Sequence, residues 1–394
     1  MPRLTLGDVQ IVPTARCNMR CHYCRGDGTR SAPLARRAVR VLLEAAGTAK
    51  ARALHVGITG GEPLSEFLLV RWIVARAESA GRGSRRPHVR LLTNGLLLDD
   101  DKIRFLDRHR VEVQVSCDGG RRAQELRCKG THRPVSALLA WLAASHPGFL
   151  ARLSVAMTVT PATVDVIAVS ARWLLDRGVR LLHIAPVMGI NGSRRDGRKS
   201  QAAALDTAFE RLFTLAVDFG DRHGYVPVAF FRKGLLDAAP RRSGAICRGP
   251  GNRSVALDAD GTLAGCVVAT RTYLPNPAPA MRPAVEALRM GAADAPLEEQ
   301  FARMRQRAEA VGVFTDRERR HSSFGRCTDC EYSDRCRVCP LAPAFEREWD
   351  DPFRVPDFQC AFNRAMFKYR DRFPAQLPLE PASPDPPPER RPRR

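Results

Sequence analysis

Three cysteines near the N-terminus have the spacing Cys17-x3-Cys21-x2-Cys24 and directly follow a short β-branched run. Three thiolates on a tight loop can bind three irons of a [4Fe–4S] cube and leave the fourth iron open to another ligand. Zinc is the alternative metal, but a zinc site requires a fourth protein ligand. The spacing therefore predicts an iron–sulfur cluster with one open iron, held by these three cysteines.

Three further motifs each follow a predicted strand. Gly60-Gly61-Glu62-Pro63 combines paired glycines, which permit close backbone approach, with a carboxylate that can receive an ammonium group. Thr93-Asn94-Gly95 contains a common turn pair, so a turn role alone is one interpretation of Asn94. Ser116 and Asp118 are two residues apart on a strand, so both can point into the same space, whereas Cys117 between them is expected to pack.

The elements that position these motifs alternate over the first two-thirds of the chain, as in a parallel sheet covered by helices. Strands are predicted at Val9–Pro13, Leu54–Ile58, Val89–Leu92, Val111–Ser116, Leu153–Val159 and Leu181–Ala185. Helices are predicted at Leu34–Ala46, Leu64–Glu78, Asp99–Arg108, Val135–Ala144, Thr163–Arg177 and Ala202–Phe219. Six such units indicate an α/β fold, a partial (β/α)6 barrel with its chemistry in the loops after the strands.

Taken together, these motifs resemble those of the radical S-adenosylmethionine (SAM) enzymes, whose cluster cleaves SAM. The resemblance implies that Tyr23 packs near the adenine, and that Glu62 or nearby backbone carbonyls bind the amino group of SAM. It also implies that Ser116 and Asp118 approach the ribose. Arg127 begins a stretch similar to R-x-x-G-[ST] and would meet the SAM carboxylate, with a surface ion pair as its alternative role. The implied SAM-binding set is Tyr23, Gly60, Gly61, Glu62, Asn94, Ser116, Asp118 and Arg127.

Seven cysteines follow residue 234, where the alternation of strands and helices ends. Their pattern is Cys247-x13-Gly261-x4-Cys266, then Cys327-x2-Cys330-x5-Cys336-x2-Cys339, then Cys360. It resembles the SPASM domain, an auxiliary-cluster module, except that the last pair of the central set is usually three residues apart. The resemblance assigns Cys247, Cys266 and Cys339 to a first auxiliary cluster, and Cys327, Cys330, Cys336 and Cys360 to a second. Two structural zinc sites are the alternative.

The first auxiliary cluster has only three cysteines under this assignment. Its fourth position is open to a substrate thiolate, a carboxylate, a histidine, water or the otherwise unassigned Cys128. Sulfatase-activating relatives place an acidic base directly after the cysteine that corresponds to Cys266, whereas Val267 and Val268 follow here. This difference argues against formylglycine formation.

The chain of 394 residues is thus predicted to contain a radical SAM barrel at 1–233 and a loop-rich iron–sulfur SPASM domain at 234–375. We expect metal rather than a broad core to hold the second domain together, and a disordered Pro/Arg-rich tail at 376–394. No apolar run is long enough to span a membrane and no signal core precedes Cys17, so a cytoplasmic location is expected. The net charge of +21 is almost all arginine, and compositional bias explains it better than a nucleic-acid partner does.

The family mechanism implies reductive cleavage of SAM to methionine and a 5′-deoxyadenosyl radical, which abstracts hydrogen from the substrate. Auxiliary clusters in this branch can accept an electron or bind substrate. Most SPASM enzymes modify a peptide or protein side chain, so we expect a maturase of ribosomally made peptides. Flavodoxin or ferredoxin would supply electrons. Only sixteen residues precede Cys17, so we expect any leader recognition to come from a separate protein.

The sequence is also compatible with three alternatives. The first is a SPASM enzyme acting on a tetrapyrrole, a sugar or a cofactor intermediate. The second is a non-catalytic iron–sulfur electron carrier, which would have no use for the motifs at 60–63 and 116–119. The third is an RNA-modifying radical SAM enzyme, which is suggested by charge alone.

Overall fold

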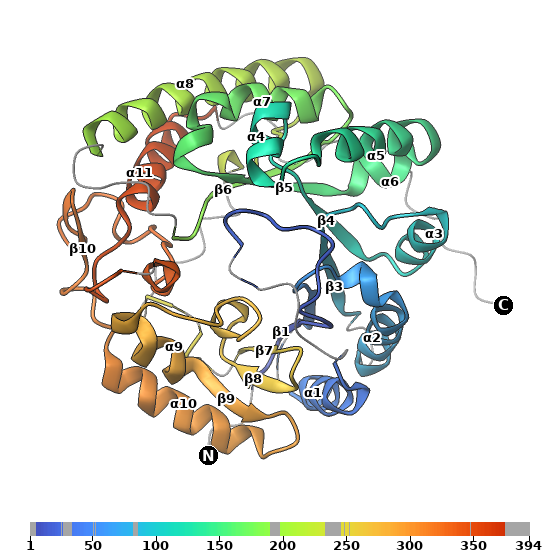
Figure 1. Ribbon diagram of the computed structural model, residues 1–394, viewed down its shortest axis with the longest axis vertical. Coiled ribbons are helices and arrows are strands. Elements are labelled where there is room, and N and C mark those ends of the chain that lie inside the picture. The colour runs from blue at the N-terminus through green and yellow to red at the C-terminus, as the bar shows by residue number, and fades with distance from the viewer. Residues whose placement is uncertain are drawn as a thin grey trace.

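The computed structural model describes residues 5–24, 26, 34–49, 51, 53–81, 86–189, 198–232, 246–247, 249–251, 253–346 and 348–374, with the backbone alone at 198–200. The predicted domain boundary at residues 233 and 234 lies outside the described residues, as does the predicted tail at 376–394. The described chain forms a curved sheet around a central space, with helices on its outer side (Figure 1).

The six predicted strands are all present and pair in parallel in chain order. They are β1 (Asp8–Ile11), β2 (His55–Ile58), β3 (His88–Thr93), β4 (Glu112–Ser116), β5 (Ser154–Val159) and β6 (Leu182–Pro186). Their apolar residues are buried because helices cover the sheet on the outside and loops fill the inside. The predicted partial barrel is therefore confirmed.

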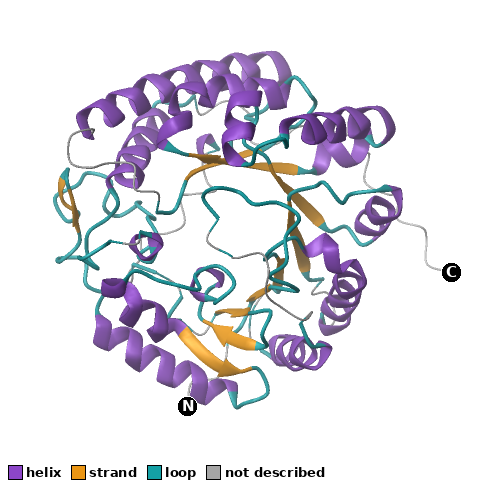
Figure 2. Cartoon of the chain, in the orientation of Figure 1, coloured by secondary structure: helices purple, strands orange, loops and turns teal. Residues whose placement is uncertain are grey.

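The six predicted helices are also present, and Figure 2 shows them outside the strands. They are α1 (Arg36–Thr48), α2 (Phe67–Ala80), α3 (Asp100–Arg108), α5 (His132–Ser145), α7 (Ile167–Leu175) and α8 (Arg198–His223). The 3₁₀ turns η1 (Pro63–Glu66) and η2 (Pro161–Val166) precede α2 and α7. Between β4 and β5 the described structure also contains two short helices that were not predicted, α4 (Arg121–Arg127) and α6 (Pro147–Arg152).

The sheet continues into the C-terminal half of the chain through three strands that the sequence analysis missed. These are β7 (Ser254–Leu257), β8 (Thr262–Ala264) and β9 (Arg289–Ala292), and the order of the described strands is β6-β5-β4-β3-β2-β1-β7-β8-β9. Strand β7 is parallel to β1, with Asp8 opposite Ser254. The carboxyl end of β7 therefore opens onto the same mouth as those of β1 to β6.

The expectation that metal rather than a broad core holds the C-terminal half together is wrong. Helices α9 (Arg282–Leu288), α10 (Leu297–Val311) and α11 (Asp357–Asp371) bury apolar side chains in a hydrophobic cluster shared with the barrel. The rings of Phe209 in α8 and Phe362 in α11, for example, pack edge to face at 4.9 Å. Burial of this kind is the main favourable term in folding, so the two halves stabilise each other.

Short elements complete the C-terminal half. They are η4 (Ala229–Phe231), η5 (Val267–Ala269), η6 (Pro279–Met281), η7 (Ala342–Phe345) and the small hairpin of β10 (His321–Ser322) and β11 (Gly325–Arg326). Among the helices that the structure describes, none is both long and apolar enough to cross a membrane.

Candidate functional site

The loop that carries the first three cysteines lies across the mouth of the barrel, immediately after β1 (Figure 1). Burial raises the pKa of the Cys21 thiol to about 11; the charge of Arg127 opposes this rise, and the nearby Cys24 and Cys17 thiols of the loop add to it. The backbone amide of Met19 donates to Cys17 Sγ over 3.4 Å. The three thiols thus share one small region, as ligands of a common cluster must.

The glycine pair after β2 packs directly against the stem of this loop. The amide of Gly61 donates to the carbonyl of Thr14 at 3.0 Å, and that of Glu62 to the carbonyl of Arg16 at 2.7 Å. A Cβ at Gly61 would lie only 2.0 Å from the Arg16 oxygen, and Gly60 has a φ of +134°. Both positions therefore require glycine, and the predicted close backbone approach takes place between this turn and the cysteine loop.

The carboxylate of Glu62 is fully buried and has three donors within the protein. Oε1 accepts from the hydroxyl of Thr93 at 2.7 Å and from the amide of Leu64 at 3.0 Å, and Oε2 accepts from the amide of Asn94 at 2.7 Å. Burial raises the pKa of this carboxyl, and the three donors oppose that rise. In the described structure Glu62 joins the turn after β2 to the turn after β3. The nearby backbone carbonyls were the other predicted partners of the SAM ammonium, and they remain candidates for binding it.

Asn94 connects the same turn to the cysteine loop. Its Nδ2 donates to Asn18 Oδ1 at 2.7 Å and lies 3.9 Å from Cys17 Sγ, while its Oδ1 accepts from the amide of Leu96. A donor beside a cluster thiolate stabilises negative charge on the sulfur. Asn94 therefore has more than the turn role that the sequence indicated.

Three of the residues predicted to surround SAM meet at the end of β4. Tyr23 Oη donates to Asp118 Oδ2 at 2.9 Å, and Arg127 Nη1 donates to Asp118 Oδ1 at 3.1 Å and to Tyr23 Oη at 2.8 Å. Burial raises the pKa of Asp118, which the charge of Arg127 counteracts. Arg127 is 8% exposed, so the alternative of a surface ion pair is wrong. The cluster loop is tied through Tyr23 to a buried ion pair.

Ser116, Cys117 and Cys128 lie close in sequence to this buried ion pair. Ser116 is half-buried at the carboxyl end of β4, and Cys117 is fully buried in the hydrophobic cluster, as expected from its opposite direction on the strand. Cys128 directly follows α4 and lies near enough to Cys21 to affect that thiol's pKa. It therefore belongs to the region of the N-terminal cysteine loop.

The C-terminal cysteines lie in two groups, one of three and one of four. In the first group, burial raises the pKa of Cys266, and the nearby Cys339 and Cys247 thiols raise it further. Burial likewise raises the pKa of Cys339 to about 12, with Cys247 again contributing. Gly249 lies against this group, and its amide donates to Cys247 Sγ at 3.2 Å.

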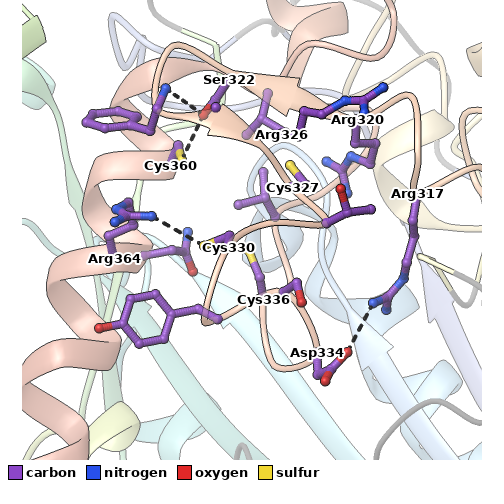
Figure 3. Close-up of a pocket in the computed structure, with 18 of the residues that line it drawn as sticks. Arg317, Arg320, Ser322, Arg326, Cys327, Cys330, Asp334, Cys336, Cys360 and Arg364 are labelled. Carbon is purple, nitrogen blue, oxygen red and sulfur yellow. Dashed lines mark hydrogen bonds and ion pairs between the residues drawn. The ribbon is translucent and has the colours of Figure 1, made fainter.

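The second group, made of Cys327, Cys330, Cys336 and Cys360, lines one cavity of about 300 Å³ (Figure 3). Cys360 comes from helix α11 and the other three come from the loop after β11. Arg364 Nη1 donates to Cys330 Sγ at 3.3 Å, and the hydroxyl of Ser322 lies 3.3 Å from Cys360 Sγ. Arg320 also faces the cavity and interacts electrostatically with Cys327 and Cys336. These cations would offset the charge of four thiolates.

Two functional candidates escaped the sequence analysis because neither lies in a motif. Tyr273, from the C-terminal half, reaches Thr59 after β2, with 2.5 Å between the two hydroxyl oxygens. Asp258, just after β7, accepts from the amides of Arg271 and Thr272 and so fixes the segment that carries Tyr273. Only the parallel pairing of β7 with β1 brings these residues to the mouth, and β7 was not predicted.

Comparison with known proteins decides the family. Residues 11–161 match the radical SAM superfamily. A GTP 3′,8-cyclase of Mycobacterium sp. (strain KMS) is 30% identical over 283 residues, which cover 66% of this chain and 75% of that protein. The chain belongs to the radical SAM superfamily. A probable GTP 3′,8-cyclase of Methanopyrus kandleri is 29% identical and covers 68% of this chain and 83% of its own length.

Solved radical SAM structures share the fold. The AdoMet-bound structure of anSMEcpe superposes with a TM-score of 0.69 at 14% identity, over 92% of this chain and 96% of that one. Streptococcus suis SuiB bound to its precursor peptide SuiA gives a TM-score of 0.58 at 14% identity, over 89% and 76%. At this identity the likeness concerns the fold alone.

This radical SAM enzyme has thiol donors suited to the family's cofactor. The loop of Cys17, Cys21 and Cys24 would hold a [4Fe–4S] cluster, and three thiolates leave one iron for SAM. Bound there, the cluster delivers an electron that cleaves SAM to a radical able to remove hydrogen from a substrate. Among the described residues, no group of three or more His, Cys, Asp and Glu is arranged to hold a single metal ion.

Proposed function

We propose that this radical SAM enzyme modifies a side chain of a ribosomally made peptide or protein. The N-terminal cysteine loop would hold the SAM-cleaving cluster, and the two C-terminal cysteine groups would hold auxiliary clusters of the SPASM type. In this proposal the backbone of the Gly60–Gly61 turn receives the SAM ammonium. Tyr23 lies by the adenine and Ser116 by the ribose, and the pair of Asp118 and Arg127 fixes Tyr23.

The separation of the seven C-terminal cysteines into two groups is the observation that carries this proposal. The group of Cys247, Cys266 and Cys339 and the group around the 300 Å³ cavity are assembled from segments far apart in the sequence. Within the first group, for example, Cys247 precedes β7, whereas Cys339 follows β11. This is the membership that the SPASM resemblance assigns, and most enzymes with that module act on peptides or proteins.

The fold neighbours support the same substrate class. One anSMEcpe structure contains AdoMet and the Kp18Cys peptide, and it matches 93% of this chain at a TM-score of 0.69. A SuiB structure contains a precursor peptide. Both matches extend through the C-terminal half, which carries the two cysteine groups.

A second candidate function is cyclisation or another modification of a nucleotide. It is favoured by the relatives named GTP 3′,8-cyclase, of which the first covers 66% of this chain at 30% identity. Like the small-molecule alternative inferred from the sequence, this function has a small molecule as substrate. The relatives' names specify a nucleotide, whereas the sequence alternative named a tetrapyrrole, a sugar or a cofactor intermediate.

A direct assay distinguishes the two candidate functions. The anaerobically reconstituted enzyme, SAM and a chemical reductant would be incubated with GTP or with short peptides encoded beside its gene. We expect one of the peptides, but not GTP, to raise the yield of 5′-deoxyadenosine and to lose hydrogen in its mass spectrum. Deuterium placed in the peptide should appear in the 5′-deoxyadenosine.

The control is a variant with Cys17, Cys21 and Cys24 replaced by Ala, which should be inactive with every substrate. Turnover of GTP without turnover of any peptide would replace our proposal with the nucleotide function. A peptide that contains cysteine also tests the open ligand position of the first auxiliary group. If the cysteine binds there, the spectrum of that group changes when the peptide is added, and a serine version of the peptide leaves it unchanged.

A further inference from the structure

Tyr273 reaches the barrel mouth from the C-terminal half of the chain. Its hydroxyl lies 2.5 Å from that of Thr59 and also interacts with the backbone of Gly60. Burial raises the pKa of Tyr273, and the nearby Cys24 thiol contributes in the same direction. The phenol therefore contacts the glycine turn, and the third cysteine of the cluster loop is near enough to act on it electrostatically.

The segment that carries Tyr273 is fixed at several points. The buried carboxylate of Asp258 accepts from the amide of Arg271 at 2.7 Å, and from the amide and hydroxyl of Thr272 at 3.2 Å and 2.5 Å. A Cβ placed on Gly26 would lie 2.9 Å from the carbonyl oxygen of Thr272. The cluster loop and this segment are therefore in direct contact, and Tyr273 has little freedom to move.

We propose that Tyr273 is a positioning residue of the SAM site, which holds the Thr59–Gly60 turn in its binding conformation from the C-terminal half. The inference rests on the proposed place of the SAM ammonium at this turn. A phenol hydroxyl bonded to the Thr59 side chain, next to Gly60, restricts the peptide groups that would face SAM. Preorganising a site in this way strengthens binding because less freedom is lost when the ligand arrives.

The role makes SAM binding depend on both halves of the chain. Strand β7 places Asp258, Asp258 places the 271–272 backbone, and that backbone places Tyr273 against Thr59. Disturbance of this segment should therefore weaken SAM binding while the cluster on the N-terminal loop stays in place. A residue that only filled space would not couple to Thr59 in this way.

The test is a double-mutant cycle on the full-length, anaerobically reconstituted enzyme. Tyr273→Phe and Thr59→Val each remove one hydroxyl and keep the shape of the side chain. We expect each to raise the Kd for SAM about three- to tenfold, which is the range for one hydrogen bond. The double variant should be little weaker than either single one. Iron content should match the wild type, and SAM should produce the same change in the EPR signal of the reduced cluster at higher concentration.

Tyr225→Phe is the matched control, because Tyr225 is a buried tyrosine that packs on Phe219 in α8. It should leave the Kd unchanged. A Kd for Tyr273→Phe equal to that of the control, additive effects in the cycle, or loss of iron from Tyr273→Phe would each overturn the role of Tyr273 alone. Failure of the wild-type enzyme to bind SAM would overturn the SAM site itself, and this inference with it.

Discussion

Arg127 and Asp118 form an ion pair beneath the cysteine loop, with 3.1 Å between Nη1 and Oδ1 and both side chains almost fully buried. Burial disfavours the charge of Arg127, but Tyr23 and Asp118 together raise the pKa of the guanidinium. Asp118 Oδ1 also accepts from the amide of Thr158 in β5 at 2.9 Å. The pair thus joins the cluster loop, α4 and β5 at a single carboxylate.

Replacement of Asp118 by Ala should cost about 3–5 kcal/mol of stability, because it leaves the charge of Arg127 buried without its counterion. SAM affinity should fall as well, since Tyr23 loses its acceptor, while the iron content stays near that of the wild type. Urea denaturation under anaerobic conditions measures the stability. Asp165→Ala is the control, because Asp165 pairs with Arg122 at the surface and such pairs contribute about 0–1 kcal/mol. Equal losses in both variants would contradict the structural role of the buried pair.

Glu62→Ala should lower stability and SAM affinity together without removing iron. Its loss would leave the Thr93 hydroxyl and the amides of Leu64 and Asn94 without their acceptor, at about 1–3 kcal/mol for each buried donor. The readouts are urea denaturation and a SAM titration. Glu112→Ala, which removes an exposed partner of Arg90, should change neither. A stable Glu62→Ala protein with weak SAM binding would instead indicate direct contact between Glu62 and SAM.

Replacement of Cys17, Cys21 and Cys24 together by Ala should remove roughly four of about twelve irons expected for three clusters. SAM cleavage should disappear with them, because no other group of thiols is proposed to bind SAM. Iron analysis and 5′-deoxyadenosine yield are the two measurements. Cys117→Ala should keep the full iron content, since this thiol lies in the hydrophobic core. Zinc in place of iron after anaerobic reconstitution would refute the cluster assignment.

The two C-terminal groups should lose iron independently. One variant has Ala in place of the second group, Cys327, Cys330, Cys336 and Cys360. It should lose roughly four irons and keep those of the first group. The other variant has Ala in place of the first group, Cys247, Cys266 and Cys339, and should lose only the irons of that group. Mössbauer spectra of the two variants should add up to the auxiliary part of the wild-type spectrum. A single variant that empties both groups would show that they form one site.

His183 in β6 should make the fold sensitive to mild acid. Burial and the charges of Arg90 and Arg232 lower the pKa of His183 from 6.5 to about 4. Between these values the unfolded chain binds a proton that the folded chain does not, so stability falls as pH decreases from about 6.5 to about 4. The urea midpoint should therefore drop less between pH 7 and pH 5 in His183→Gln than in the wild type. His223→Gln, at an exposed position, should follow the wild type.

The barrel could be predicted from the sequence because its strands are apolar runs and its helices have a regular apolar period. Strand β7 is as short as β1, but it lies beyond the part of the chain where strands and helices alternate, and it is fixed by its pairing with β1. The positions of the motif residues were predictable, but their partners were not. Nothing near Glu62 in the sequence indicates that Thr93 and Asn94 would donate hydrogen bonds to its carboxylate. Tyr273 is the extreme case, because its contact with Thr59 depends on a strand that could not be predicted.

The parallel pairing of β1 with β7 also means that the sheet cannot form completely until late in synthesis of the chain. Strand β1 is made early, whereas β7 begins at Ser254, so one edge of β1 waits unpaired while most of the chain is translated. An unpaired edge invites pairing with other chains, which makes a nascent or truncated barrel prone to aggregate. The segment of Thr272 and Tyr273, which lies beside the cysteine loop, is translated later still. The cysteine loop therefore lacks this neighbouring segment until the C-terminal half has been made.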